Sequence, residues 1–236
     1  SDLTTLPIHR VIARGITVAV DGEMQVECPH FNWPQPVRET VHLGRPIAAA
    51  DFEIPAPEGA NTVTARVIGV VENQAPTKAL TAQLPVTDGA VRGADGVCQI
   101  ALVERHRGTG DVVNGVVSGF GYAGQMAIAS TVAHDRHHMS VVGTSPLDMA
   151  AEANRLAEVG GGVTVWKDGE EIALVELPIA GLMSDAPAHW VAQQAERIVA
   201  AMADCGCTLN NAYMQHSLLA LVVIPELRIS DLGLVD

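Results

Sequence analysis

The sequence has no long apolar run and few basic residues. Its longest continuous apolar stretch, residues 218–224, has seven residues, whereas a transmembrane helix needs about 20. Lysine and arginine number 14 against 27 aspartates and glutamates, which gives a formal net charge of −13. Nucleic acids and anionic membrane surfaces repel a chain of this charge. We therefore expect neither membrane insertion nor nucleic-acid binding.

Features typical of export and of a disulfide framework are also absent. The N-terminus has no basic region followed by an apolar core, so no signal peptide is expected. The four cysteines, Cys28, Cys98, Cys205 and Cys207, are too widely spaced for a small disulfide scaffold. The last two form a C-x-C pair that could chelate a metal, although structural thiols are the favoured interpretation. The sequence predicts a cytoplasmic protein.

Common catalytic and phosphate-binding motifs are missing as well. There is no G-x-S-x-G, no P-loop and no H-E-x-x-H. Residues 119–124 have the glycine spacing of a dinucleotide fingerprint, but no helix is expected to follow, so we predict a backbone bend. The glycine triplet at 160–162 follows a helix instead of opening one, which disfavours a phosphate site.

The apolar content, 48% of the residues, is ample for a buried core. Helices are predicted after Thr144-Ser145-Pro146, ending at the glycine triplet, and after Ser184-Asp185, ending at Cys205-Gly206. The predicted fold class is α+β, a mostly antiparallel sheet with two main helices. Strands are expected over residues 62–71, 79–86, 96–104, 112–120, 126–133, 139–142, 163–166 and 171–177.

Three regions are predicted along the chain. Residues 1–28 form a short strand pair with a turn at Asp21-Gly22. Residues 29–60 hold six of the 13 prolines. Because proline lacks a backbone donor and fixes φ, we expect an extended connector there. Residues 61–236 form the α+β domain.

Histidines gather in residues 134–138, His-Asp-Arg-His-His. In a strand, His134, Arg136 and His138 would lie on one face, with Asp135 and His137 on the other. Imidazole and carboxylate groups together can bind a transition metal or relay protons near neutral pH. The alternative is a tight turn in which these side chains only form hydrogen bonds.

Two further segments contain candidate ligand-binding residues. Residues 104–110 follow an apolar strand and bring Glu104, Arg105 and His106 to a glycine-containing loop. The Arg105 guanidinium is suited to a carboxylate or phosphate, whereas a solvated polar hairpin is the alternative. Residues 177–185 form an apolar loop, either a buried connection capped by Ser184 or Asp185 or the wall of a pocket.

Read in order, these segments resemble the C-terminal region of bacterial adenine deaminases, which are metal-dependent amidohydrolases. The resemblance covers residues 60–236 approximately, and residues 1–28 are more weakly similar to the strands that follow the barrel in such enzymes. One departure stands out, because the family's His-Asp-Ser-His-Asn is here His-Asp-Arg-His-His at 134–138. The matching landmarks are residues 104–106, 108–110, 119–121, 127–137, 141–144, 160–162, 177–185 and 223–228.

The resemblance implies hydrolysis of a cyclic amidine C–N bond, adenine and water giving hypoxanthine and ammonia. It also implies a divalent transition metal, Mn, Fe or Zn, held mainly by a (β/α)₈ barrel that this sequence lacks. Within the chain, the chemistry of the histidine segment makes His134, His137 and His138 candidate metal ligands. The catalytic candidates are His134, Asp135, His137, His106 and Arg105, and the substrate-binding candidates are Glu104, Ser184, Asp185 and Phe120.

Three functions are compatible with the sequence. In the first, the chain is the C-terminal portion of an adenine-deaminase-like enzyme that binds a purine-like substrate together with a barrel domain or subunit. In the second, it is a self-sufficient metal-dependent hydrolase of a small cyclic amide or purine-like ring. In the third, it is a non-catalytic binding or assembly module. A homo-oligomer is expected in addition.

Overall fold

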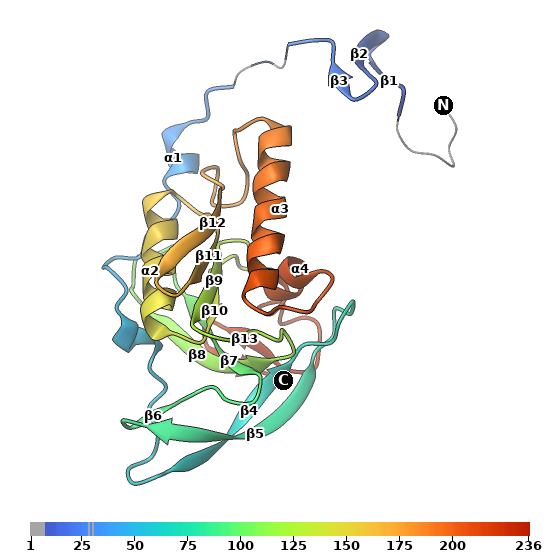
Figure 1. Cartoon of the computed structure of the whole chain (residues 1–236). Coiled ribbons are helices and arrows are strands. Elements are labelled where there is room, and N and C mark those ends of the chain that lie inside the picture. The colour runs from blue at the N-terminus through green and yellow to red at the C-terminus, as the bar shows by residue number, and fades with distance from the viewer. Residues whose placement is uncertain (1–7, 28, 30) are drawn as a thin grey trace. The chain divides into compact units, whose positions relative to one another are not determined.

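The computed structural model describes residues 8–27, 29 and 31–236, which divide into two compact units between Trp33 and Pro34 (Figure 1). The smaller unit is a three-stranded antiparallel sheet in the order β1-β2-β3, formed by Arg10–Ala13, Ile16–Val20 and Glu23–Met24. The predicted turn at Asp21-Gly22 is present. The predicted pair gains a third strand because a second turn, at Arg14-Gly15, also has positive φ at both residues. Residues 1–7 and Cys28 of the predicted 1–28 region lie outside the described residues.

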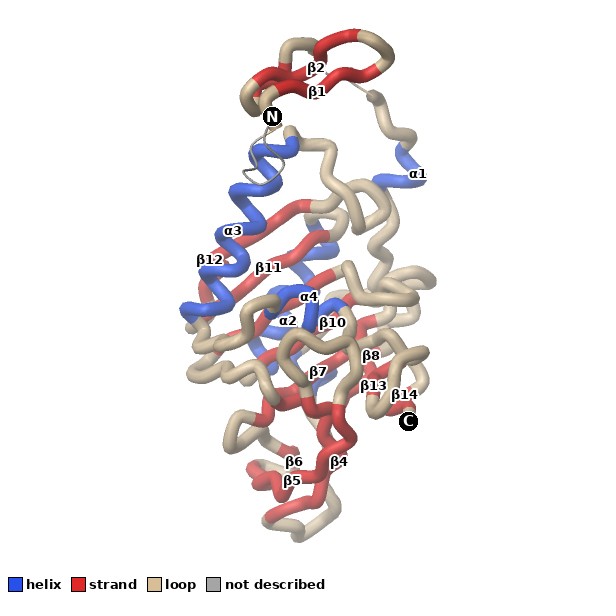
Figure 2. Tube along the Cα trace, turned by 90° about the vertical axis from the view of Figure 1, so that its right-hand side faces the viewer, coloured by secondary structure: helices blue, strands red, loops and turns tan. Residues whose placement is uncertain are grey.

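The larger unit contains a nine-stranded sheet in the order β12-β11-β9-β10-β7-β8-β4-β5-β6 (Figure 2). Neighbouring strands are antiparallel except for β4 and β8, which are parallel. The predicted α+β class is therefore confirmed. The strands are β4 (Thr62–Gly69), β5 (Lys78–Thr87), β6 (Ala90–Val91), β7 (Val97–Val103), β8 (Val112–Ser118), β9 (Met126–Ser130), β10 (Met139–Gly143), β11 (Gly162–Lys167) and β12 (Glu170–Glu176).

Two long helices cover opposite faces of this sheet. Helix α2 (Pro146–Glu158) packs against β9, β10 and β11, and α3 (Ala188–Asp204) packs against β11 and β12 (Figure 1). Within β9, Ala127 and Ala129 belong to the cluster under α2, and Ile128 belongs to the cluster under α3. Burial on both faces explains why the central strands are mostly apolar.

Smaller elements complete the unit. A two-stranded hairpin follows the last helix and packs against β7 and β8. None of the helices in the described part of the chain is long and apolar enough to cross a membrane. The smaller elements of the larger unit are α1 (Gln35–Arg38), the 3₁₀ helix η1 (Ala49–Phe52), α4 (Ala212–Ser217), β13 (Arg228–Ser230) and β14 (Gly233–Val235).

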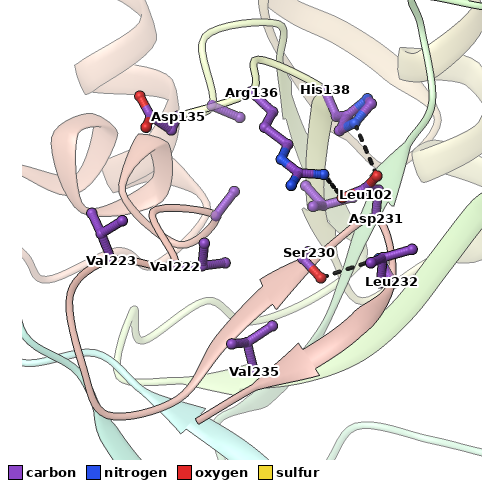
Figure 3. A pocket seen from close by; sticks show the side chains of 12 residues that line it. Leu102, Asp135, Arg136, His138, Val222, Val223, Ser230, Asp231, Leu232 and Val235 are labelled. Atoms are coloured by element: carbon purple, nitrogen blue, oxygen red, sulfur yellow. Dashed lines mark hydrogen bonds and ion pairs between the residues drawn. The ribbon is translucent and has the colours of Figure 1, made fainter.

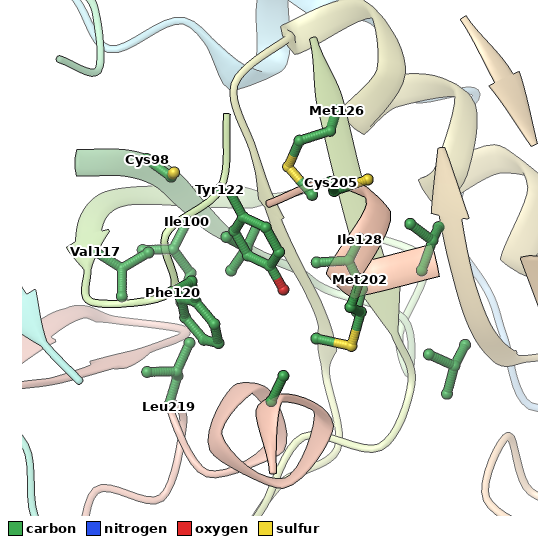
Figure 4. Close-up of a cluster of buried hydrophobic side chains, with 14 of the residues drawn as sticks. Cys98, Ile100, Val117, Phe120, Tyr122, Met126, Ile128, Met202, Cys205 and Leu219 are labelled. Carbon is green, nitrogen blue, oxygen red and sulfur yellow. The ribbon is translucent and has the colours of Figure 1, made fainter. Parts of the chain in front are cut away.

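The core on the α3 side surrounds an aromatic pair (Figure 4). Phe120 is 1% exposed and stacks on Tyr122 with the ring centroids 5.1 Å apart. Cys98 and Cys205 lie in the same cluster, and burial raises the pKa of each thiol to about 11. These cysteines are structural side chains of the core.

The proline-rich segment differs from the extended connector that we predicted. From Pro34 onward it belongs to the larger unit, and Leu43, Ile47 and Phe52 are buried. The Asn154 side chain of α2 accepts from the backbone N–H of Ile47 at 3.0 Å and donates to its carbonyl at 2.8 Å. Regular structure here is limited to the short helices α1 and η1, but the apolar residues of the segment still pack into the core.

Helix α2 also places two carboxyl groups in the interior. Glu152 is fully buried and Asp148 is 2% exposed. Burial raises the pKa of Glu152 well above its ordinary value, and the nearby Asp148 carboxylate raises it further. There is therefore a pH range in which Glu152 is neutral in the folded protein but ionised in the unfolded chain.

We therefore expect the free energy of unfolding to depend on pH through Glu152, at pH values above the pKa of this group in the unfolded chain. The folded state keeps the proton while the unfolded state releases it, so stability is lost as pH rises from about 4.5. We expect Glu152→Gln to raise the melting temperature at pH 8 by at least about 2 °C, the shift that about 1 kcal/mol gives a protein of this size. At pH 4.5 the difference from wild type becomes small.

Differential scanning calorimetry at both pH values measures this difference. Glu170→Gln, in an exposed position at the start of β12, is the control and should shift the melting temperature equally at the two values. A Glu152→Gln effect that does not vary with pH would contradict the assignment of a neutral carboxyl group.

Candidate functional site

The histidine-containing segment is the connection between β9 and β10. Its residues 134–136 form a turn instead of continuing the strand, so strand alternation does not set the directions of these side chains. His137 has a φ of +53°, and its backbone N–H donates to the Ala133 carbonyl at 2.7 Å. The segment is therefore a turn, as in the alternative prediction, and not a strand.

Arg105 fixes this turn from inside the protein. Its side chain is 1% exposed and donates to three carbonyls: His137 at 2.5 Å, Thr40 at 3.0 Å and Ala180 at 3.2 Å. Burial lowers the pKa of Arg105 to about 10, against the opposing effect of Glu104. The predicted catalytic arginine thus holds three loops together, and it lines neither of the cavities described below.

Thr131, at the start of the connection, joins the same loops at a second point. Its hydroxyl donates to the Gly181 carbonyl at 2.6 Å and accepts from the backbone N–H of Gly162 at 2.8 Å. Thr131 therefore links the glycine triplet 160–162 to the apolar loop 177–185, next to the histidine turn.

Glu104 organises the neighbouring loop. Its carboxylate accepts from the backbone N–H groups of His106 at 2.6 Å, Arg107 at 3.0 Å and Thr109 at 3.3 Å. Burial would by itself raise the pKa of Glu104, but these three donors and nearby His138 together lower it. An ionised carboxylate is therefore held beside the imidazole of His138.

Two imidazoles and a second carboxylate meet Glu104 at this place. The rings of His106 and His138 have centroids 4.9 Å apart. His138 lies between carboxylates, with Nδ1 4.0 Å from Glu104 and Nε2 3.8 Å from Asp231. Arg136 donates to the other oxygen of Asp231 at 2.7 Å. Figure 3 shows Arg136 and His138 directed toward Asp231, with Asp135 pointing away from them.

Arg136, His138 and Asp231 belong to a wall that two cavities share. The smaller, of about 350 Å³, has Val222 and Val223 on its far side. The larger, of about 580 Å³, is polar and contains Glu104 and His106. The residues that line both cavities are Leu102, Arg136, His138, Asp231 and Leu232. Burial, His106 and Arg105 lower the pKa of His138, and Asp231 and Glu104 oppose them, so its ring is neutral at pH 7.

The predicted three-histidine metal set does not come together. His134 forms an edge-to-face pair with His137, with the ring centroids 5.2 Å apart, while His138 pairs with His106. Within residues 8–27, 29 and 31–236, no group of three or more His, Cys, Asp or Glu side chains is placed to hold a metal ion. The chain's described residues thus do not fit a metal centre of their own.

The remaining predicted substrate-binding residues lie elsewhere. Phe120 belongs to the core, as described above, because strand β8 ends at Ser118, earlier than predicted, and the bend that follows turns the ring inward. The Ser184 hydroxyl accepts from the N–H of Ala186 at 3.2 Å, and Asp185 is paired with Arg38. Both precede α3, but neither caps it, because the N-cap position is Pro187 and no side chain forms a cap hydrogen bond.

Asp231 is the site residue that sequence reasoning missed. It occupies the turn between β13 and β14, 95 positions from Arg136. Residues 230–233, Ser-Asp-Leu-Gly, have only the composition of a turn. Nothing in that short segment indicates which distant residues it will contact.

Comparison of the sequence with known proteins identifies the family to which the chain belongs. A family model described as the adenine deaminase C-terminal domain matches residues 74–236. The chain therefore belongs to the adenine deaminase C-terminal domain family, as its resemblance indicated.

Individual relatives extend the similarity to the N-terminal unit. The whole chain is similar to adenine deaminases from Ruegeria sp. strain TM1040 at 72% identity, Paracoccus denitrificans at 66% and Moorella thermoacetica at 42%. It covers 39%, 39% and 40% of those proteins, respectively. The chain thus spans about two fifths of the length of the curated relatives that it matches.

Proposed function

We propose that the chain is the C-terminal part of an adenine deaminase and that it acts with a metal-bearing barrel domain or subunit. The observation that carries this proposal is similarity along the whole chain to proteins named adenine deaminase, at up to 72% identity. Since the chain covers only 39% of that relative, there is room in such a protein for a barrel outside the matched region.

The proposed reaction replaces the amino group of adenine with oxygen. A C–O bond forms from water and the C–N bond to the amino group breaks. One proton of the water leaves with the amino group as ammonia, and the other stays on the hypoxanthine product. A bound Mn, Fe or Zn ion would supply an activated hydroxide. We assign that ion to the barrel, because the described residues of this chain offer no metal centre.

The chain itself contributes groups that hold and move protons. His106, His138, Glu104 and Asp231 line the larger cavity, and imidazoles and carboxylates are the usual acid–base groups of enzymes. We retain His106 and Glu104 as proposed site residues and add His138 in an acid–base role. His134, Asp135 and His137 are proposed to shape the turn that carries His138.

The test combines this chain with a separately produced barrel portion and measures ammonia and hypoxanthine released from adenine. Activity is expected only when both parts and Mn²⁺, Fe²⁺ or Zn²⁺ are present. Each part alone with the same metals is the control. A correctly folded, metal-loaded combination that releases no ammonia from adenine would overturn the proposal.

The other two functions make different predictions for the chain alone. A stand-alone hydrolase would bind metal stoichiometrically and lose it in His134→Ala, which elemental analysis would detect. An assembly module would form a stable oligomer that binds neither metal nor purine. Light scattering also tests the homo-oligomer that we propose for the complete protein.

A further inference from the structure

The two oxygens of Asp231 have different neighbours. One accepts from the Arg136 guanidinium at 2.7 Å. The other lies 3.8 Å from Nε2 of His138. Because Arg136 already engages the first oxygen, the second is the one directed to the His138 ring.

The carboxylate on the opposite side of the ring is already used by the backbone. Nδ1 of His138 lies 4.0 Å from Oε1 of Glu104, and that oxygen accepts from the N–H groups of His106 and Arg107. Its second oxygen accepts from Arg107 and Thr109. Each carboxylate oxygen has about two acceptor sites, so Asp231 is the better acceptor for a proton on His138.

A neutral imidazole carries its proton on only one nitrogen, and the nitrogen that has the better acceptor keeps it. Nδ1 of His138 is buried and has no hydrogen-bond partner among the described residues. We propose that Asp231 is a positioning residue that fixes His138 as the Nε2–H tautomer. The Nδ1 lone pair is then left as an acceptor on the Glu104 side of the larger cavity.

This arrangement defines the chemistry of a ligand in the larger cavity. A ligand that reaches Nδ1 meets a lone pair and must present an N–H donor to it, such as the exocyclic amino group of an aminopurine. This assignment of the ligand rests on the proposed function, whereas the tautomer of His138 does not.

The tautomer can be measured on the 236-residue chain by NMR with ¹⁵N-labelled histidine, at a pH where the ring is neutral. A His138→Gln variant assigns the resonances. We expect the Nε2–H form to predominate in the wild type and its ratio to the Nδ1–H form to fall about tenfold in Asp231→Ala, because the carboxylate 3.8 Å from Nε2 is removed. Asp231→Asn keeps an acceptor oxygen and should retain the wild-type tautomer.

Arg136→Met is the matched control, because it removes the same ion pair but leaves the Asp231 carboxylate beside His138. A predominant Nδ1–H form in the wild type would overturn the inference even if the Asp231 variants failed to fold. An unchanged ratio in folded Asp231→Ala would overturn it as well. Absence of adenine turnover by the combined enzyme, with the tautomer as expected, would overturn only the proposed function.

Discussion

Replacing Arg105 with methionine is expected to lower the free energy of unfolding by about 3 kcal/mol, because a buried acceptor that loses its partner costs about 1–3 kcal/mol. The guanidinium is 1% exposed and is a donor to the carbonyls of Thr40, His137 and Ala180. Methionine fills much of the volume but donates to none of them. Urea unfolding followed by circular dichroism at pH 7 measures the loss.

Arg107→Met tests the same chemical change in the exposed neighbour and should stay within about 0.5 kcal/mol of the wild type. Arg105→Lys is expected to recover little of the stability, because one ammonium group cannot reproduce the fork that reaches three separate loops. Equal losses in Arg105→Met and Arg107→Met would show that the buried fork is not a main source of stability.

Gly161→Ala is expected to cost about 3 kcal/mol, from a strained backbone and from overpacking together. Gly161 has a φ of +112°, where side chains are rarely found. A Cβ atom there would lie 2.5 Å from Cα of Gly181 and 3.0 Å from the Thr131 hydroxyl. The variant would separate the loops that Thr131 joins beneath the histidine turn.

Gly169→Ala separates the two contributions. Gly169 also has a positive φ, +85°, but a Cβ atom added there would meet nothing within 4 Å. It therefore reports the backbone cost alone, about 1 kcal/mol. Thermal or urea unfolding of both variants gives the difference, and equal losses would mean that the close approach of residues 161 and 181 contributes nothing.

The sequence predicted the sheet and both main helices because local patterns determine them. Ser145 caps α2 by accepting from the N–H of Asp148 at 3.3 Å, and Pro146 occupies the first helical position, as expected from Thr144-Ser145-Pro146. The apolar strands are recognisable because both faces are covered. Short elements such as β13 and β14 carry no comparable pattern, and they were not predicted.

Side-chain directions at the site depended on contacts that local sequence does not encode. The loop 104–110 and the turn 134–138, both singled out from the sequence, meet in the structure. Arg105 points into the protein because three distant carbonyls converge there, and Phe120 because the chain bends after β8. Asp231 enters the site through the pairing of β13 with β14 and their packing on β7 and β8.

In the resemblance drawn from the sequence, a serine and an asparagine stand where this chain has Arg136 and His138, and both of these residues face one carboxylate, that of Asp231. A serine at 136 would leave this acid without its cation, and an asparagine at 138 would remove the ring that it orients. We therefore expect evolutionary change at positions 136, 138 and 231 to be coupled. We expect relatives to exchange the three residues as a set, and chimeric proteins that mix the two patterns to lose the geometry of this wall.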